Sequence, residues 1–111
     1  MDPILRHIEA RTVLALDQQV QTMPGQIVSK TLVQNQAVSI TLFAFDQGEE
    51  ISTHDTTGDA LISVLAGRGR ITIDGEEFFL TAGQSIVMPA KHPHAVFAPE
   101  PFTMMLTVVF P

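Results

Sequence analysis

Cysteine is absent from this chain. Its absence excludes disulfide frameworks, cysteine-based zinc ribbons and catalysis by a thiolate nucleophile. It also fits a reducing compartment, and we therefore expect a cytoplasmic protein. A chain of 111 residues can bury a core without such cross-links, so we expect a single domain over residues 1–111.

Basic residues are few, and they do not cluster in the sequence. Six lysines and arginines stand against 12 acidic residues, which gives a net charge of −6. The basic positions are Arg6, Arg11, Lys30, Arg68, Arg70 and Lys91. A protein that binds nucleic acid needs a clustered basic face to neutralise phosphates, so we expect no nucleic-acid partner. An anionic membrane surface would repel the chain for the same reason.

Long apolar runs are missing as well. No window approaches the roughly 18 apolar residues of a membrane-spanning helix. No basic segment followed by an apolar run indicates a signal peptide. We therefore expect a soluble protein with no membrane partner. The apolar fraction is nevertheless 45%, which is high for so short a chain and predicts that some surface is buried in a homodimer.

The N-terminal arm, residues 1–36, is the less regular part of the sequence. Asp2 can cap a short helix that begins at Pro3, with the apolar residues of segment 4–8 on one face. His7 lies in this segment, and we expect it at the surface.

Short strands separated by glycine and proline fill the rest of the chain. The expected strands are Gln26–Val33, Val38–Phe45, Leu61–Leu65, Arg70–Ile73, Glu76–Leu80, Gln84–Met88, His94–Phe97 and Thr103–Phe110. Asp74-Gly75 is the strongest hairpin signal among the connections. No helix-length periodic stretch interrupts the strands. This pattern predicts an all-β sandwich or small barrel.

Three of the four histidines lie in two short segments that contain glycine. Residues 48–67 contain His54, and residues 83–94 contain His92 and His94. The spacing within both segments resembles the two motifs of the cupin superfamily. The matching positions are Gly48, His54 and Gly67 in the first motif, and Gly83, Pro89 and His94 in the second.

The resemblance covers roughly residues 37–110, the motif core of the chain. It implies a double-stranded β-helix, also called a jelly-roll barrel, with a site inside. In that family three histidines and a glutamate typically hold a divalent ion of iron, manganese, nickel, copper or zinc. This chain keeps His54 and His94 of those ligands.

The chain departs from both motifs at specific positions. Thr56 stands where the first motif has its second histidine, and Ala60 stands where it has its glutamate. Lys91 and Ala98 replace the glycine and the asparagine of the second motif. The resemblance therefore implies a divalent metal held with fewer protein ligands, hence more weakly.

Strand parity gives an independent expectation for the pocket, because alternate residues of a strand face the same side. If His54 points into the barrel, then Thr56 and Ala60 do so too in the absence of a bulge. Asp59 would then point outward, and only a bulge would make it a ligand. The expected pocket residues are Thr56, Ala60, Met88 and Val96.

Each histidine has a second interpretation. His54 and His94 are either ligands for metal or substrate, or two structural histidines in an apolar interior that need hydrogen-bond partners. His92 is either a third nitrogen ligand or general base, or a solvated residue of the turn before Pro93.

Three functions follow as alternatives. The first is a metal-dependent enzyme acting on a small organic molecule, such as a dioxygenase, isomerase or decarboxylase. The second is a metal-free enzyme like the cupin sugar epimerases, which is disfavoured because they need a tyrosine acid and this chain has no tyrosine. The third is a metal-free module that binds or senses a small molecule without catalysis.

Overall fold

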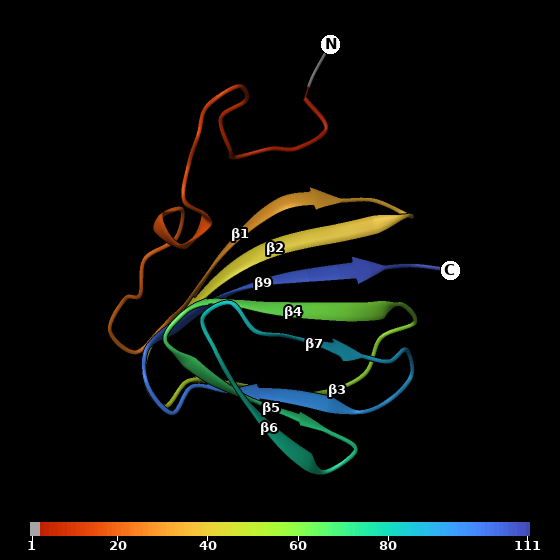
Figure 1. The fold of residues 1–111 in the computed structure, drawn as a ribbon. Coiled ribbons are helices and arrows are strands. Elements are labelled where there is room, and N and C mark those ends of the chain that lie inside the picture. The colour runs from red at the N-terminus through yellow and green to blue at the C-terminus, as the bar shows by residue number, and fades with distance from the viewer. Residues whose placement is uncertain (1–2) are drawn as a thin grey trace.

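The structure is a computed structural model, and it describes residues 3–111. Nearly all regular structure in this range is β-strand, with a single short 3-10 helix (Figure 1). The elements are η1 (Leu16–Gln18), β1 (Ile27–Gln34), β2 (Val38–Phe45), β3 (Glu50–His54), β4 (Asp59–Ala66), β5 (Arg68–Ile73), β6 (Glu76–Thr81), β7 (Ser85–Met88), β8 (His94–Phe97) and β9 (Phe102–Val109). The all-β prediction is confirmed.

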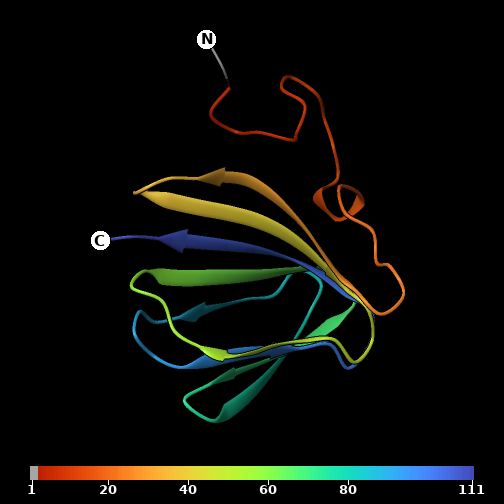
Figure 2. The same cartoon turned by 180° about the vertical axis from the view of Figure 1, so that it is seen from behind.

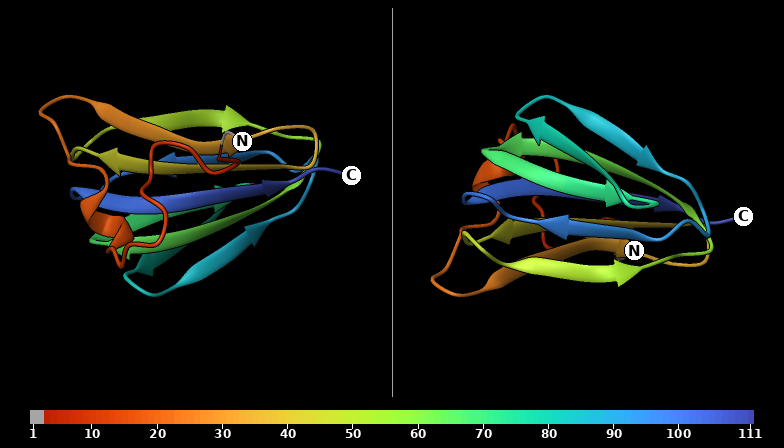
Figure 3. Two further views of the ribbon diagram at one scale, coloured as in Figure 1. Left: turned by 90° about the horizontal axis from the view of Figure 1, so that it is seen from above. Right: turned by 90° about the horizontal axis from the view of Figure 1, so that it is seen from below.

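The strands form two antiparallel sheets that face each other. One sheet has five strands in the order β1-β2-β9-β4-β7, and the other has four in the order β3-β8-β5-β6. Most neighbours are not consecutive in the chain, which is the connectivity of a jelly roll. Views from above and below show the strands of both sheets running along one long direction (Figure 3).

The inner faces of the two sheets bury the main core. Every second residue of β4 and β9 points inward, as the period of a strand requires. The largest fully buried side chains on these faces include Phe45, Ile62, Ile71, Phe102 and Met104. The Phe45 and Phe102 rings stack with centroids 4.7 Å apart, which fills the end of the sandwich away from the histidines.

A second apolar cluster lies on the outer face of the five-stranded sheet. Leu42 and Ala44 of β2 are fully buried there, together with Val20 from the N-terminal arm. The arm runs over the β1 side of the sheet and away from the four-stranded sheet (Figure 2). The five-stranded sheet is therefore covered on both faces over part of its area.

The N-terminal helix is predicted at the wrong place. Asp2 lies outside the described residues, and residues 3–9 form bends with no helix. The single helical turn in residues 3–111 is η1, farther along the arm. The segment 3–9 is too short to be a stable helix on its own, and two of its apolar side chains are exposed, Ile4 to 76% and Leu5 to 49%. No helix within residues 3–111 is long and apolar enough to cross a membrane.

Every expected strand overlaps an observed one, and β2 and β8 have the predicted bounds. One observed strand, β3, is absent from the expected strands. Its sequence Glu50-Ile51-Ser52-Thr53-His54 has a single apolar residue, so it lacks the alternation that predicts a strand. It forms because β8 supplies a pairing partner at the edge of the sheet.

Candidate functional site

A small cavity lies between the sheets, at the end where β3 and β8 pair. Its volume is about 40 Å³. The residues around it are Ile51, His54, Thr56, Ala60, Ile62, Met88, His94, Val96, Met104, Leu106 and Val108. Two imidazoles and one hydroxyl are thus the polar side-chain groups in an otherwise apolar lining. Within the described residues, no charged carboxylate or basic side chain lines it.

His54 reaches this cavity because of an irregularity in β3. Ile51 pairs with Val96, but it is His54 that pairs with His94, so β3 has one residue more than β8 between the two pairs. In a regular ladder Thr53 would stand opposite His94, and His54 would face the other side. The β-bulge therefore turns His54 inward, as bulges near sites commonly do. His54 is exposed and lies at the mouth.

His94 comes from the opposite strand, β8, and only 3% of its surface is exposed. The Nε2 atoms of His54 and His94 lie 3.1 Å apart, and the two rings meet edge to face. The exposed ring of His54 thus lies on the solvent side of the pair, and the buried ring of His94 lies on the cavity side.

Backbone carbonyls determine which ring nitrogens carry protons. Nδ1 of His54 donates to the Ser52 carbonyl at 2.9 Å, and Nδ1 of His94 donates to the His92 carbonyl at 3.2 Å. A carbonyl oxygen only accepts, so each Nδ1 carries the hydrogen. In the neutral rings both Nε2 atoms are then unprotonated, and each is free to accept a proton or to bind a metal.

Burial lowers the pKa of His94 from its ordinary value of 6.5, and the neighbouring His54 lowers it further. The hydrogen bond to the His92 carbonyl and the negative charge of Asp55 oppose these effects. His94 is therefore a neutral ring near pH 7, which is the form that can donate its Nε2 lone pair to a metal.

The four expected pocket residues, Thr56, Ala60, Met88 and Val96, all border the cavity. Thr56 donates its hydroxyl hydrogen to the Gly58 carbonyl at 2.8 Å. The Thr56 oxygen is thus held by its own loop, and it faces the cavity only as an acceptor. Ala60 is 1% exposed and presents no more than a methyl group.

His92 does not join the pair. Its ring lies outside the cavity lining and is about half exposed, and its Nδ1 contacts Oδ2 of Asp74 at 2.6 Å. Asp59 is exposed, and its Oδ1 accepts a hydrogen bond from the Ala90 amide at 2.8 Å. No group of three or more histidine, cysteine or acidic side chains in residues 3–111 is placed to hold a metal.

Sequence reasoning missed the contribution of β9 and of two backbone carbonyls. Met104, Leu106 and Val108 of β9 form one wall of the cavity. Their alternation in the sequence was a sufficient signal that they face inward, but not that they face the histidines. The carbonyls of Ser52 and His92 carry no sequence signal, because every residue has one.

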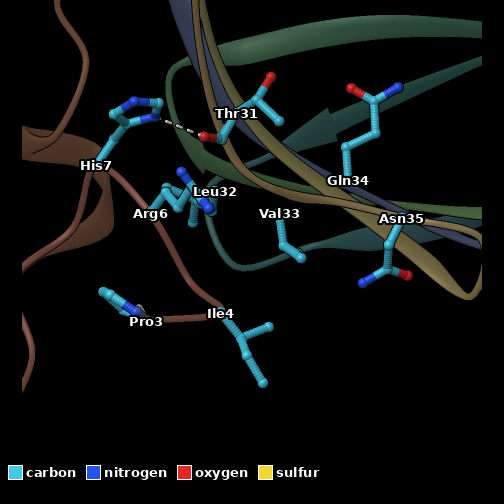
Figure 4. A pocket seen from close by; sticks show the side chains of 9 residues that line it. All are labelled: Pro3, Ile4, Arg6, His7, Thr31, Leu32, Val33, Gln34 and Asn35. Atoms are coloured by element: carbon cyan, nitrogen blue, oxygen red, sulfur yellow. Dashed lines mark hydrogen bonds between the residues drawn. The ribbon is translucent and has the colours of Figure 1, made fainter. Parts of the chain in front are cut away.

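A second hollow lies between the N-terminal arm and β1, far from the histidine pair in the chain (Figure 4). Arg6 donates its amide to the Leu32 carbonyl at 2.7 Å, and Nδ1 of His7 donates to the Thr31 carbonyl at 2.9 Å. His7 is exposed, as expected. These bonds attach the arm to the outer edge of β1, which is an edge strand of its sheet.

Comparison with known proteins gives one family and many similar structures. Residues 41–110 match the model of the cupin domain. A conserved protein of unknown function from Streptococcus pyogenes is 45% identical, with 99% of this chain and 96% of that chain covered and a TM-score of 0.96. A cupin superfamily protein from Desulfitobacterium hafniense is 28% identical, with coverages of 96% and 98% and a TM-score of 0.92.

A third structure, a cupin 2 conserved barrel domain protein from Leptotrichia buccalis, is 41% identical with a TM-score of 0.81. The match covers 83% of this chain but only 45% of that longer chain. Among curated proteins, no significant match is found.

Proposed function

The chain belongs to the cupin family, and on that premise we propose that it binds a divalent metal ion through His54 and His94, with a small organic ligand beside it. The bound metal would supply a Lewis acid and an acidified water at the mouth of the cavity. We propose further that the protein is a metal-dependent enzyme that acts on this ligand, as an oxygenase, an isomerase or a decarboxylase.

One observation carries the proposal: the unprotonated Nε2 atoms of His54 and His94 lie 3.1 Å apart. Imidazole nitrogens bind zinc at about 2.0–2.1 Å. Two such ligands at tetrahedral or octahedral angles on one ion are therefore separated by about 2.9–3.4 Å. The Nε2–Nε2 separation in this protein falls within that interval. The rings meet edge to face with centroids 4.3 Å apart, so at least one of them must turn before both Nε2 atoms point at one ion.

The outer contacts of the pair support the same function. Histidines that ligate metals usually donate their other ring N–H to a carbonyl or carboxylate, which fixes the tautomer and the ring orientation. Both histidines have such a partner here, Ser52 for His54 and His92 for His94. The donor set is neutral imidazole, which suits zinc, copper, nickel and iron better than manganese.

The alternative is a metal-free cupin that binds or senses a small molecule. Its support is that three or more metal-binding side chains do not meet anywhere in residues 3–111. In that case the two histidines are structural, each held by its hydrogen bond to a backbone carbonyl, and the apolar cavity is the binding site. The two functions differ in whether metal uptake depends on the histidines.

Metal titration by calorimetry, with elemental analysis of protein purified without chelators, distinguishes them. We expect the wild type to take up one zinc, nickel or copper ion per chain, with copper tightest and manganese weakest. His54→Ala and His94→Ala each lose this uptake, and His7→Ala, which removes a histidine of the arm, retains it. Equal uptake by all four proteins, or no uptake by any, refutes the metal site and favours the metal-free alternative.

We also propose that the chain forms a homodimer in the cytoplasm. The N-terminal arm exposes Ile4, Leu5 and Val13, and β1 is an edge strand that the arm contacts with two hydrogen bonds, so a second copy could cover the arm and this edge together. The absence of cysteine supports the cytoplasmic location.

A further inference from the structure

We propose that a second copy of this chain docks on the free edge of β6, so that the two four-stranded sheets continue into one sheet across a two-fold axis at Phe78. β6 is the last strand in the order β3-β8-β5-β6. It lies on the far side of the molecule from the N-terminal arm (Figures 1 and 2). This surface is therefore separate from the arm surface proposed above.

The backbone of β6 has free hydrogen-bonding groups at Glu77 and Phe79. Thr81 donates its amide to Oε1 of Gln84 at 2.9 Å, and its carbonyl accepts the Gln84 amide at 3.0 Å. Both groups of Thr81 thus point away from β5. Because this direction alternates along an antiparallel strand, the groups of Phe79 and Glu77 point away from β5 too. Such an edge is a template for a further strand.

These groups determine the register of an added copy. Thr81 is already used by Gln84, so the new hydrogen bonds must come from Glu77 and Phe79. Antiparallel pairing places Glu77 of each copy opposite Phe79 of the other, and each of these pairs exchanges both of its bonds. The arrangement is the same from either copy, as a two-fold axis requires.

The side chains on the outer face are complementary in this register. Phe79 is 47% exposed, and Cζ of Arg68 lies 4.1 Å from the centroid of its ring. No acidic side chain within residues 3–111 forms an ion pair with Arg68. Glu77 of the second copy stands opposite Phe79, and it therefore brings a carboxylate to this guanidinium. The two Glu77 side chains do not stand opposite each other, so the acidic residue does not prevent the pairing.

The inner face of the edge offers apolar contact. Phe78 is partly buried against the main core, and a groove of about 390 Å³ borders it between β6 and β7. Ile86 of β7 lines the same groove. In the proposed register the Phe78 rings of the two copies stand opposite each other in a pair without backbone bonds, where side chains approach most closely. The pairing thus buries apolar surface that is open in the single chain.

The association should be weak and reversible. β6 has six residues, and its edge offers hydrogen bonds at Glu77 and Phe79 alone within the described chain. Small contacts of this kind are typical of transient complexes, so we expect the molecules to pair as the concentration rises from about 10 µM to about 1 mM.

The experiment is sedimentation equilibrium over this range of concentration, with the variant Ile4→Ser, Leu5→Ser as the starting protein. These substitutions weaken the arm surface, so the remaining change of mass reports on β6. We expect the mass to rise toward twice its value at low concentration. Hydrogen exchange by NMR gives a second readout, in which the Phe79 amide should exchange several-fold more slowly at about 1 mM. The Thr81 amide, which is bonded within the chain, should not change.

Charge reversal tests the register. Arg68→Glu and Glu77→Arg should each raise the dissociation constant roughly fivefold or more, because the two-fold axis turns both ion pairs into repulsions at once. The two reversals together restore opposite charges and should return the constant to near its original value. Glu9→Arg, on the arm, changes the net charge as Glu77→Arg does and should have no such effect.

Two results would overturn the pairing. A mass that stays constant up to about 1 mM excludes the second copy and leaves the β6 edge to an extended segment of a different protein. An association that neither Arg68→Glu nor Glu77→Arg changes lies on another surface of the molecule.

Discussion

The Nε2 atoms of His54 and His94, which lie 3.1 Å apart, are the ring nitrogens of the pair that can still bind a cation. Both Nδ1 atoms donate to carbonyls, so a proton can add to either ring only at Nε2, the atom that would bind a metal. A proton and a metal ion therefore compete for the same place. Metal binding should weaken as the pH falls below about 6, where imidazoles take up protons.

The buried ring of His94 also connects folding stability with pH. Burial and His54 lower its pKa in the folded protein from the ordinary value of 6.5, which the unfolded chain retains. Below pH 6.5 the unfolded chain therefore binds more protons than the folded one, and the free energy of unfolding falls. The stabilisation is complete above that pH and is lost as the pH falls toward the lowered pKa.

We expect urea unfolding of the metal-free protein to give a lower free energy at pH 5.5 than at pH 7.5. In His94→Gln this difference should become smaller, because the titrating group is gone. His7→Gln, which removes an exposed histidine, should keep the difference of the wild type. A wild type with the same stability at both pH values would contradict the prediction.

At the level of elements, the bulge in β3 decides where His54 points. The sequence predicts both histidines, the pocket residues Thr56 and Ala60 and the jelly roll, because motif spacing and strand alternation are visible in it. The bulge is not visible, because it depends on how Ile51 and His54 pair with β8. Of the two interpretations of His92, the solvated turn residue matches the structure. The sequence does not decide between them, because the orientation of the ring follows from Asp74, a partner that is remote in the chain.

The connection between β4 and β5 has a geometry that only glycine fits, at Gly67. Gly67 has φ +75°, and a Cβ at this position would lie 2.4 Å from the Pro101 carbonyl oxygen. The connection therefore packs directly against the start of β9. Gly75 in the β5–β6 hairpin has a similar φ of +81°, but a Cβ there would meet no atom within 4 Å.

The pair Gly67→Ala and Gly75→Ala separates backbone strain from contact. Both substitutions place alanine in the left-handed region, at a cost of about 1–2 kcal/mol. Gly67→Ala must also push against the backbone at Pro101, which should add about 1–3 kcal/mol. Denaturant unfolding with both variants in parallel measures this, and equal losses of stability would show that the contact at Gly67 costs nothing.

On the scale of the whole molecule, the two edges of the five-stranded sheet differ. At one edge β7 is short and exposes Val87 to 55%. At the other edge β1 is longer and is partly covered by the N-terminal arm, which is itself poorly covered. Ile4 is 76% and Val13 102% exposed. An apolar arm beside a long edge strand is a surface that natural sheets usually protect.

We expect the protein to be a homodimer at micromolar concentration, in which this arm and the β1 edge meet their counterparts in the second copy. The same patch would then serve both subunits, as two-fold symmetry requires. The double substitution Ile4→Ser and Leu5→Ser should raise the dissociation constant roughly tenfold or more, because it removes two apolar side chains from the interface. Val87→Ser, at the opposite edge, removes a comparably exposed valine and should leave the constant unchanged.

Light scattering after size exclusion measures the mass over a dilution series, and a single-chain mass for the wild type at micromolar concentration would rule the dimer out. A shift caused by Val87→Ser rather than by the arm would instead place the interface at β7.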